Sequence, residues 1–515
     1  MVAPQTPAPQ PARGPGWLRG ILARLRRGRP PGDMIAASVG DGNQGVAVGK
    51  NIVQIGTLVI PVIPVVAGLA LLVAGAGAFV YFSLVPAQMT GLFNVAVAEF
   101  GQVDASGQVH HSPDGERLSK WIYDGLQDEL RGLPPELQVQ AWHDSMDWRQ
   151  KRVKIGIIRG KTPEERTTDA ASVAKAINAR IVIYGNLAVS QQPTGFVPEF
   201  YVAQFSGEAD EIVGRHQLGE LIPIPLPIDW TDPVRVLSLN PDLKTRTKAL
   251  TLFTVGLFYD LAGQSAKALA VFMQAIDQLN ESDLEQGKEI LYLFIGRTAF
   301  QLKRYDDALQ AFTTALKINP DYARAHLGLG NVHYQQGQDL LMRIEPLTPA
   351  EGAELDRLLD LAADEYRTAL TLAPTVPGSP VELKSHIMLG GTYRLQGDRL
   401  QRLGDFSAAE AAFDLAVVEY QTALRQAEPM TPANQAAAYL GLATTYHLQA
   451  HTHVARGDDT GSVALWQAAV EAYELCIATA DAAAYDRVSL ELKKDYCVPY
   501  RTIASQEWIK RGGTP

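Results

Sequence analysis

The sequence predicts a multi-domain chain with an N-terminal single transmembrane helix, a small α/β domain and a C-terminal all-α superhelix. Three observations lead to this prediction. Residues 51–98 contain no Asp, Glu, Lys or Arg. Between residues 93 and 216, segments with the period of strands alternate with segments with the period of helices. From Leu250 onward, a helical pattern repeats along the chain.

The charge-free run contains a candidate membrane span. Residues 65–85, VVAGLALLVAGAGAFVYFSLV, are almost wholly apolar, and a helix needs about 20 such residues to cross a bilayer core. We therefore predict a transmembrane helix over residues 57–87, in contact with the lipid bilayer. Pro61 and Pro64 fall in its first turn, where a missing N–H is tolerated. A cleaved signal peptide is the alternative, because residues 85–87 are small, but the leader and apolar core exceed the usual lengths.

The charge on either side of this span predicts its orientation. The chain has a net charge of -10, yet residues 1–50 carry seven Arg and Lys against two acids. Positive charge beside a span stays on the cytoplasmic side, so we predict a single-pass protein with a cytoplasmic N-terminus and an extracytoplasmic C-terminal body. The acidic body argues against nucleic acid as a partner.

The residues before the span form a basic head and a Gly-rich segment, together residues 1–56. Pro, Gly and Arg dominate residues 1–32, which predicts disorder. Residues 33–56 alternate small apolar residues with Gly, Asn and Asp, which favours short strands and turns. The run GVAVGKN resembles a phosphate-binding loop only loosely, because three residues rather than four separate its glycines. We predict no cofactor.

One side of the predicted span carries small residues, which allow two membrane helices to approach closely. These residues are Ala67, Ala70, Ala74, Gly77 and Ala78. They predict self-association through the span, and alanines that merely face lipid are the alternative.

The α/β domain is predicted over residues 91–228. Its first strand, FNVAVAEF, precedes a helix with Leu118, Ile122 and Leu126 on one face, and a later helix runs directly into the strand that begins at Ile181. Two further strands, near residues 200–205 and 211–216, would close the sheet as an antiparallel pair. Prolines that begin at Pro223 predict extended chain, leading into a linker over residues 229–248.

This order of elements carries a resemblance. The strand FNVAVAEF, the helix LSKWIYDGLQDEL and the ending AINARIVIYGNL look like the TolB amino-terminal and CsgG-like domains of bacterial cell-envelope proteins. The resemblance covers residues 91–220 and is carried most clearly by residues 176–185. It implies an extracytoplasmic interaction module rather than a catalytic domain.

The C-terminal part has the spacing of a known repeat. Gly296, Tyr305, Ala308, Phe312 and Ala315 lie at the positions expected of the tetratricopeptide repeat (TPR) family, and the next glycine follows 34 residues after the first. The matching positions of the other units are Gly256, Tyr259, Ala268, Phe272 and Ala275; Gly330, Ala362, Tyr366 and Ala369; Gly390, Ala416, Tyr420 and Ala423; and Gly441, Ala469, Tyr473 and Cys476. The sequence resembles that family strongly.

The resemblance implies a solenoid of helix pairs. We expect five TPR units over residues 249–485, the last three with lengthened helices, and a capping helix and tail over residues 486–515. The first helix of each pair would line a concave groove suited to a protein or peptide partner. The predicted partner-binding residues are Phe253, Leu257, Leu293, Arg297, Leu327 and Asn331.

The sequence offers little catalytic chemistry. His447 and His451 share a helical face, but no HExxH pattern or third ligand accompanies them, so packing is the better interpretation. No serine lies in G-x-S-x-G. We predict no catalytic or metal-binding residue and no enzyme activity. Cys476 and Cys497 are the two cysteines, and either one disulfide or two buried thiols fits the sequence.

These features together predict a membrane-anchored protein–protein interaction scaffold that uses a TPR solenoid. The alternative is a ligand-sensing or regulatory envelope component whose α/β domain binds a small molecule or partner. A polar pocket in the α/β domain would favour the alternative, and a filled domain core would count against it. An enzyme would require a polar cluster that only the fold assembles.

Overall fold

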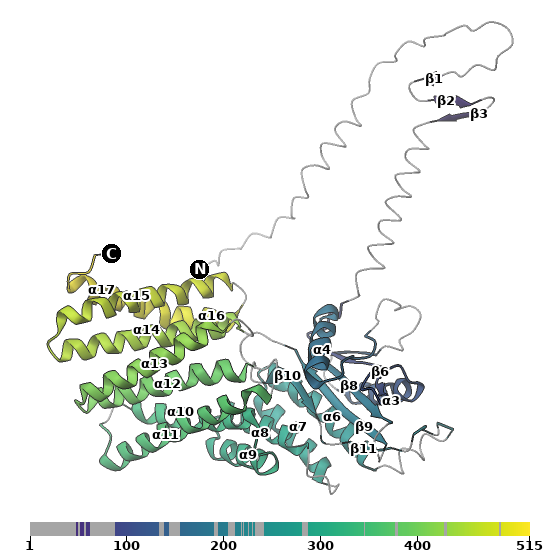
Figure 1. Ribbon diagram of the computed structural model, residues 1–515, viewed down its shortest axis with the longest axis horizontal. Helices are drawn as coiled ribbons and strands as arrows, with labels where there is room; N and C mark the ends of the chain where they lie inside the picture. The colour runs from purple at the N-terminus through teal and green to yellow at the C-terminus, as the bar shows by residue number, and fades with distance from the viewer. Residues whose placement is uncertain are drawn as a thin grey trace, which may run out of the picture. The chain divides into compact units, whose positions relative to one another are not determined.

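The computed structural model describes residues 48–49, 52–55, 58–61 and 88–514, except 133–138, 144–154, 190–193, 204–211, 218, 220, 225, 229, 232–240, 281–286, 344–345, 376–379, 427–429 and 484–485. The chain divides into two units, Met1–Val85 and Pro86–Pro515, and each is described by itself. The described residues are mostly helical, with a small sheet region (Figure 1).

The first unit contains a three-stranded antiparallel sheet in the order β1 (Val48–Gly49), β2 (Ile52–Ile55) and β3 (Leu58–Pro61). β1 and β2 lie in the segment where the sequence favours short strands. Ile55 pairs with Leu58, so two residues separate β2 from β3. Pro61 ends β3, an edge strand, where a missing N–H is tolerated.

The predicted transmembrane helix over residues 57–87 is corrected by this structure. Its first residues form β3, since the β-branched Val59 and Ile60 favour a strand over a helix. Across the described residues, no helix is both long enough and apolar enough to span a membrane. The predictions of bilayer contact and of a single-pass topology, with a cytoplasmic N-terminus and an extracytoplasmic body, are corrected with it. Residues 1–47 and 62–87, which include the predicted disordered head and the small-residue stripe, lie outside the described residues.

The second unit begins with a mixed sheet in the order β10-β9-β8-β4-β7. Strand β4 runs parallel to its neighbours β7 and β8, while β9 runs antiparallel to β8 and β10. The strands are β4 (Phe93–Val97), β7 (Val139–His143), β8 (Ile181–Ala188), β9 (Gly195–Val202) and β10 (Gly214–Gln217). Three short strands join the same sheet outside this order: β5 (Gly101–Val103), β6 (Val109–His110) and β11 (Ile222–Pro223). β5 pairs with β6 and β8, and β11 pairs with β9.

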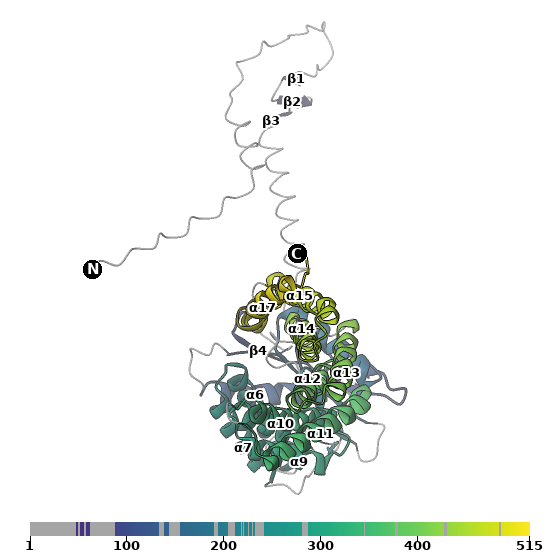
Figure 2. The same cartoon turned by 90° about the vertical axis from the view of Figure 1, so that its left-hand side faces the viewer.

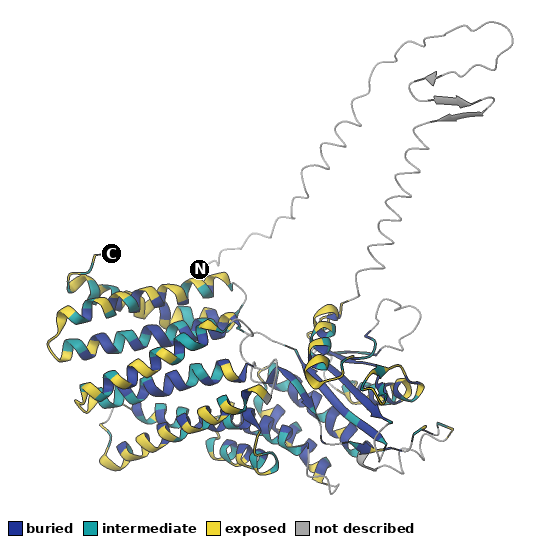
Figure 3. Ribbon diagram, in the orientation of Figure 1, coloured by how far each residue is buried: buried dark blue, intermediate teal, exposed yellow. Residues whose placement is uncertain are grey.

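Both faces of the sheet are covered, as the alternation of side chains along β4 requires. Val95 and Val97 join the cluster that contains Leu118 and Ile122 of α3 (Pro113–Leu130). Ala96 joins the cluster formed with α4 (Pro163–Ile177). Figure 3 shows the strands as buried, so the core of the α/β domain is filled by apolar side chains.

From residue 241 onward, the described residues form five antiparallel helix pairs and a C-terminal cap, stacked in chain order (Figures 1 and 2). The pairs are α6 (Pro241–Leu261) and α7 (Ser265–Asn280); α8 (Lys288–Gln301) and α9 (Tyr305–Ile318); α10 (Ala323–Leu341) and α11 (Pro349–Leu372); α12 (Val381–Arg402) and α13 (Phe406–Arg425); and α14 (Pro432–Ala455) and α15 (Asp459–Ala482). The short 3-10 helix η4 (Ala373–Thr375) follows α11. α6 begins at Pro241, inside the range expected to be linker, because proline is well suited to the first turn of a helix.

An aromatic ring of the second helix packs against a glycine of the first in each of the early pairs. A Cβ added at Gly296 of α8 would come within 2.7 Å of the Phe312 ring of α9, and one at Gly328 of α10 within 2.5 Å of the same ring. Phe312 therefore fills the space between two successive first helices. The absence of a side chain at these glycines is what allows the helices to approach.

The longer pairs repeat this packing further along their helices. Gly337 lies seven residues after Gly330, and Leu359 lies seven residues before Tyr366. Gly330 faces Tyr366 and Gly337 faces Leu359, at 2.6 Å and 3.1 Å from an added Cβ. The added residues thus extend both helices by two turns in register, so the pair stays closely packed along its length.

The C-terminal cap comprises α16 (Arg487–Leu492), the π-helical turn η5 (Lys493–Cys497) and α17 (Val498–Lys510). Cys476 of α15 and Cys497 of η5 form a disulfide, and both are fully buried. The sequence left open whether these cysteines pair. The bridge ties the cap to the last repeat, whose outer side would otherwise have no neighbour.

We predict that Gly328→Ala destabilises the protein. The new methyl group would overlap the Phe312 ring, and overpacking of this kind costs about 1–3 kcal/mol. The matched control is Gly125→Ala in α3, where no neighbouring atom lies within 4 Å of the added Cβ and the helix should gain about 1 kcal/mol. Urea denaturation of both variants checks this, and equal stabilities would contradict the packing account.

A histidine–glutamate contact links the two helices within each of two neighbouring helix pairs. His326 Nδ1 of α10 lies 2.6 Å from Glu365 Oε2 of α11, and His386 of α12 makes the same contact with Glu419 of α13 at 2.6 Å. The Glu365 carboxylate raises the pKa of His326, because it stabilises the charged imidazolium. The charged pair therefore stabilises the folded form.

We predict a pH dependence that comes from His326. Its pKa is higher in the folded than in the unfolded chain, so its stabilisation is fully present below about pH 6.5 and is lost as the pH rises through the raised value. His326→Gln should therefore cost more stability at pH 6 than at pH 9. Denaturation curves at both values check this, with Glu365→Gln expected to behave alike. A cost independent of pH would show that the pair is not charged.

Candidate protein-binding site in the helical groove

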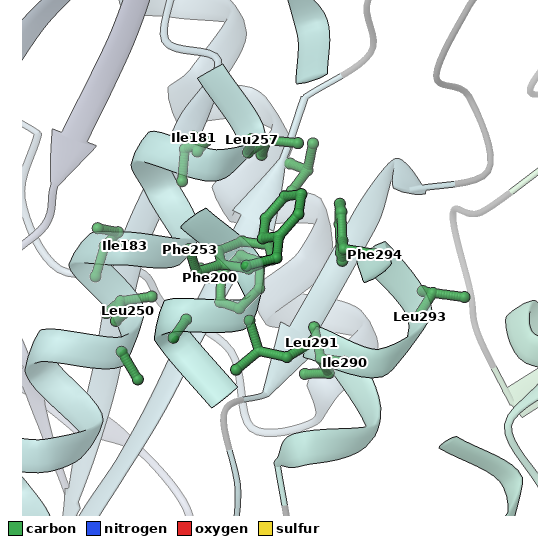
Figure 4. Close-up of a cluster of buried hydrophobic side chains, with 14 of the residues drawn as sticks. Ile181, Ile183, Phe200, Leu250, Phe253, Leu257, Ile290, Leu291, Leu293 and Phe294 are labelled. Atoms are coloured by element: carbon green, nitrogen blue, oxygen red, sulfur yellow. The ribbon is translucent and has the colours of Figure 1, made fainter. Parts of the chain in front are cut away.

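The sheet covers the inner face of the first helix pair. Phe253 of α6 lies 4.9 Å from Phe200 of β9 and 4.7 Å from Phe294 of α8, measured between ring centroids. Phe253 and Leu257 are fully buried. Figure 4 shows these side chains between the sheet and helices α6 and α8. The α/β domain and the first helix pair therefore share one apolar core.

Strand β10 and the two residues before it continue this contact along the groove. The His216 ring stacks on Phe200 at 5.0 Å, and its Nε2 donates to the Ile212 carbonyl at 2.7 Å. Burial lowers the pKa of His216 well below its usual value, so the ring is neutral. Arg324 of α10 donates to the Val213 carbonyl at 2.8 Å. Residues 212–216 thus form one wall of the groove.

A cavity of about 220 Å³ opens beside this wall, between α8 and α10. Its lining residues are Ile212, Leu293, Arg297, Phe300, Gln301, Phe312, Arg324, Leu327, Gly328 and Asn331. The volume is below the range of about 300–1,000 Å³ typical of sites for drug-sized ligands. A cavity of this size suits one side chain of a bound polypeptide.

Two polar contacts set the chemistry of this cavity, which we call the groove cavity. Arg297 is paired with Asp260 of α6, and both side chains are buried. The ion pair neutralises the guanidinium charge. The Tyr366 hydroxyl donates to Oδ1 of Asn331 at 2.9 Å. Since an amide group also carries two N–H donors, Asn331 can donate to a backbone carbonyl in the groove.

Comparison with known families supports the repeat architecture. Residues 296–337, from the middle of α8 through α9 into α10, match the family model for the TPR repeat. This segment is a tetratricopeptide repeat. The prediction of a TPR chain is thereby confirmed for the part of the sequence that also forms most of the groove cavity.

No curated protein matches the chain. Among solved structures, it is similar to TTC0263, described as a thermophilic TPR protein of Thermus thermophilus (16% identity, 46% of this chain and 99% of that chain, TM-score 0.26). It is also similar to PilW, described as a type IV pilus biogenesis factor (18%, 51% and 97%, 0.28), and to MamA (18%, 39% and 85%, 0.25). TM-scores this low do not support an inference about the function of this chain.

These comparisons do not show the resemblance of residues 91–220 to TolB amino-terminal and CsgG-like domains. It stays a prediction. The TPR assignment rests instead on the matched repeat and on the glycine–aromatic packing of the helix pairs.

The structure separates the predicted partner-binding residues into two groups. Leu293, Arg297, Leu327 and Asn331 line the groove cavity of the TPR segment. Phe253 and Leu257 lie instead under the sheet, where they are fully buried. The repeat pattern places all six on the inner face, but it cannot show that another domain covers part of that face.

Other cavity residues were not predicted. Phe300 and Gln301 follow Arg297 by three and four residues on the same helical face, so extending the TPR positions by one turn would have found them. Ile212 comes from the α/β domain. No sequence signal indicates its approach to α8 and α10, because the contact is made only by the tertiary fold.

His447 and His451 were considered as metal ligands in the sequence, and the structure shows what surrounds them. His447 and His451 lie 4.8 Å and 4.9 Å from the buried Trp466 ring. Burial lowers the pKa of His447 to about 4. Within the described ranges, no group of three or more His, Cys, Asp or Glu residues could hold a metal ion. The two rings serve as packing residues of the last helix pair.

We predict that Arg297 and Asp260 are energetically coupled. Asp260→Asn would leave a buried guanidinium without its carboxylate, and breaking a buried pair in this way costs about 3–5 kcal/mol. The double variant Asp260→Asn/Arg297→Gln should cost less than the sum of the two single changes. Denaturant unfolding of the four proteins measures the coupling energy, and additive costs would contradict the pairing.

Proposed function

We propose that the protein is a protein–protein interaction scaffold whose TPR groove binds an extended peptide or a partner helix. The observation that carries this proposal is the groove cavity, which is built from inner-face positions of α8 and α10. TPR proteins as a class bind protein partners, and solenoids of helix pairs present such concave surfaces for this purpose.

The contacts of the cavity indicate how a partner would be held. Leu293 and Leu327 offer an apolar surface for one inserted side chain. Asp260 neutralises Arg297, so the part of the lining formed by Leu293, Arg297 and Leu327 favours an apolar side chain, and Arg324 is the remaining cation of the lining. Asn331 would donate to a backbone carbonyl of the partner. This hydrogen bond fixes the position of the bound chain whatever its side chains are.

The sheet limits the length of groove available. Phe253 packs on Phe200 of β9, and both Phe253 and Leu257 are fully buried, so a partner would engage the groove from α8 onward. Tyr334 lies one turn after Asn331 on α10 and is partly exposed, which extends the proposed surface toward α12. The binding surface would therefore begin at the second TPR unit.

We assign the groove no catalytic role and no cofactor. Its ionic pair, Arg297 with Asp260, is buried and mutually neutralised, and Asn331 supplies neither a nucleophile nor a base. The chemistry of the cavity fits recognition of a chain rather than its conversion.

We predict that Asn331→Asp weakens binding of a groove peptide at least tenfold. The substitution keeps an oxygen for the Tyr366 hydroxyl but replaces the amide donors with a second oxygen, so the hydrogen bond to the partner's carbonyl becomes a repulsion. Peptides selected from a random display library on the full-length protein supply the probe, and calorimetric titration supplies the dissociation constant.

Gln310→Glu is the matched control, because it makes the same chemical change on an exposed face of α9 and should leave the affinity unchanged. Replacing the anchoring apolar residue of the peptide by Ala should also weaken binding. Equal affinities of the wild type and Asn331→Asp for every selected peptide would sink the proposed use of the groove.

A further inference from the structure

A second and larger cavity lies where the α/β domain meets the repeats. Its volume is about 370 Å³, within the usual range for small-molecule sites. The residues that line it are Pro163, Glu164, Thr167, Arg215, His216, Gln217, Glu289, Ile290, Asn319, Asp321, Tyr322 and Arg324. They come from α4 and β10 on one side, and from α8 and the α9–α10 connection on the other. We call it the junction cavity.

The junction cavity carries charges of both signs. Arg215 and Arg324 contribute positive charge, and Glu164, Glu289 and Asp321 contribute carboxylates. Each of the two sides supplies both a cation and an acid. A simple anion would meet the carboxylates and a simple cation would meet the arginines, whereas a ligand with one charge of each sign can satisfy both.

Arg215 belongs to a trio of charged groups around the buried Glu199 that has an excess of positive charge. Glu199 of β9 is 1% exposed and accepts from Nε and Nη2 of Arg166, both at 3.0 Å, and from Nη2 of Arg215 at 2.6 Å. Two guanidinium groups thus share one carboxylate. Arg215 is the cavity-lining member of the trio, so the extra positive charge lies beside the cavity.

Two successive residues of β10 that line the cavity carry unpaired polar atoms on opposite faces of the sheet. Among the described residues, Nε of Arg215 and Nδ1 of His216 are buried without a hydrogen-bond partner. Nε2 of His216 donates to the Ile212 carbonyl, and the ring is neutral, so Nδ1 is an acceptor. An unpaired buried donor or acceptor is costly, so a small shift of the Arg215 side chain toward a ligand's acceptor in the cavity would remove the cost at its Nε.

We propose that the junction cavity binds a small zwitterion, a free amino acid or a dipeptide. Its carboxylate would accept from Arg215, and its ammonium group would face Glu289 of α8 on the other side of the cavity. This site is separate from the proposed peptide groove and goes beyond the scaffold function. Because residues of both the α/β domain and the repeats line the cavity, the bound ligand would bridge the two.

The first experiment titrates the full-length protein with a panel of free amino acids and dipeptides, followed by calorimetry and thermal unfolding. We expect saturable binding by at least one zwitterion. The same compound with its amine acetylated, or with its carboxylate converted to an amide, should bind at least tenfold more weakly. Equal binding of these blocked forms, or no binding by any member of the panel, would overturn the proposal.

Variants locate the site. Arg215→Lys keeps the charge but removes Nε, and Glu289→Gln keeps the shape but removes the negative charge; each should weaken binding at least tenfold. Arg131→Lys and Glu354→Gln make the same changes at exposed ion pairs elsewhere and should bind like the wild type. Unchanged binding by both cavity variants would place the ligand elsewhere and refute the assignment.

Hydrogen exchange of the wild-type protein provides a measurement that does not depend on the folding of any variant. Saturating ligand should slow amide exchange in β10, in the first turn of α8 and around Tyr322. Ligand-dependent protection confined to other segments would contradict the proposal, even if the titration shows binding.

Discussion

Close packing of an aromatic ring against a glycine determines how the helical part of this protein is built. Phe312 occupies the space opposite Gly296 of its own pair and Gly328 of the next first helix. One ring therefore fixes both the spacing within a pair and the spacing between pairs. In the longer units the same contact recurs two turns further on, between Gly337 and Leu359. The helices can lengthen because each added segment brings its own small residue and its own large one.

The apolar contact between sheet and helices decides which part of the groove is open. Phe200, Phe253 and Phe294 join β9 to the first helices of two repeats, so the α/β domain occupies the place that a partner would take on the first unit. The inner face of a solenoid is thus used twice. On the first helix pair, this face packs against the sheet and stabilises residues 86–515 as one folded unit. From α8 onward, the same face presents the groove cavity.

The sequence predicts best where the physical signal is local. The glycine, alanine and aromatic positions of the repeat are set by contacts between helices adjacent in the chain, so their spacing alone indicated the TPR segment and four cavity residues. The covering of Phe253 and Leu257 depends on contacts across long stretches of sequence, and no periodicity reports it. The predicted membrane span was wrong for a related reason. Apolar content alone cannot distinguish a helix from the paired strand that Leu58 and its β-branched neighbours form.

Arg324 connects the two cavities that the junction creates. Its side chain lines both the groove cavity and the junction cavity, and it donates to the Val213 carbonyl that holds the wall between them. It is buried, so its position depends on the polar groups around it. Arg324 is therefore a lining residue that the two cavities share. The polar groups gathered at this junction and the groove cavity beside it both depend on the packing of the α/β domain against the first repeats.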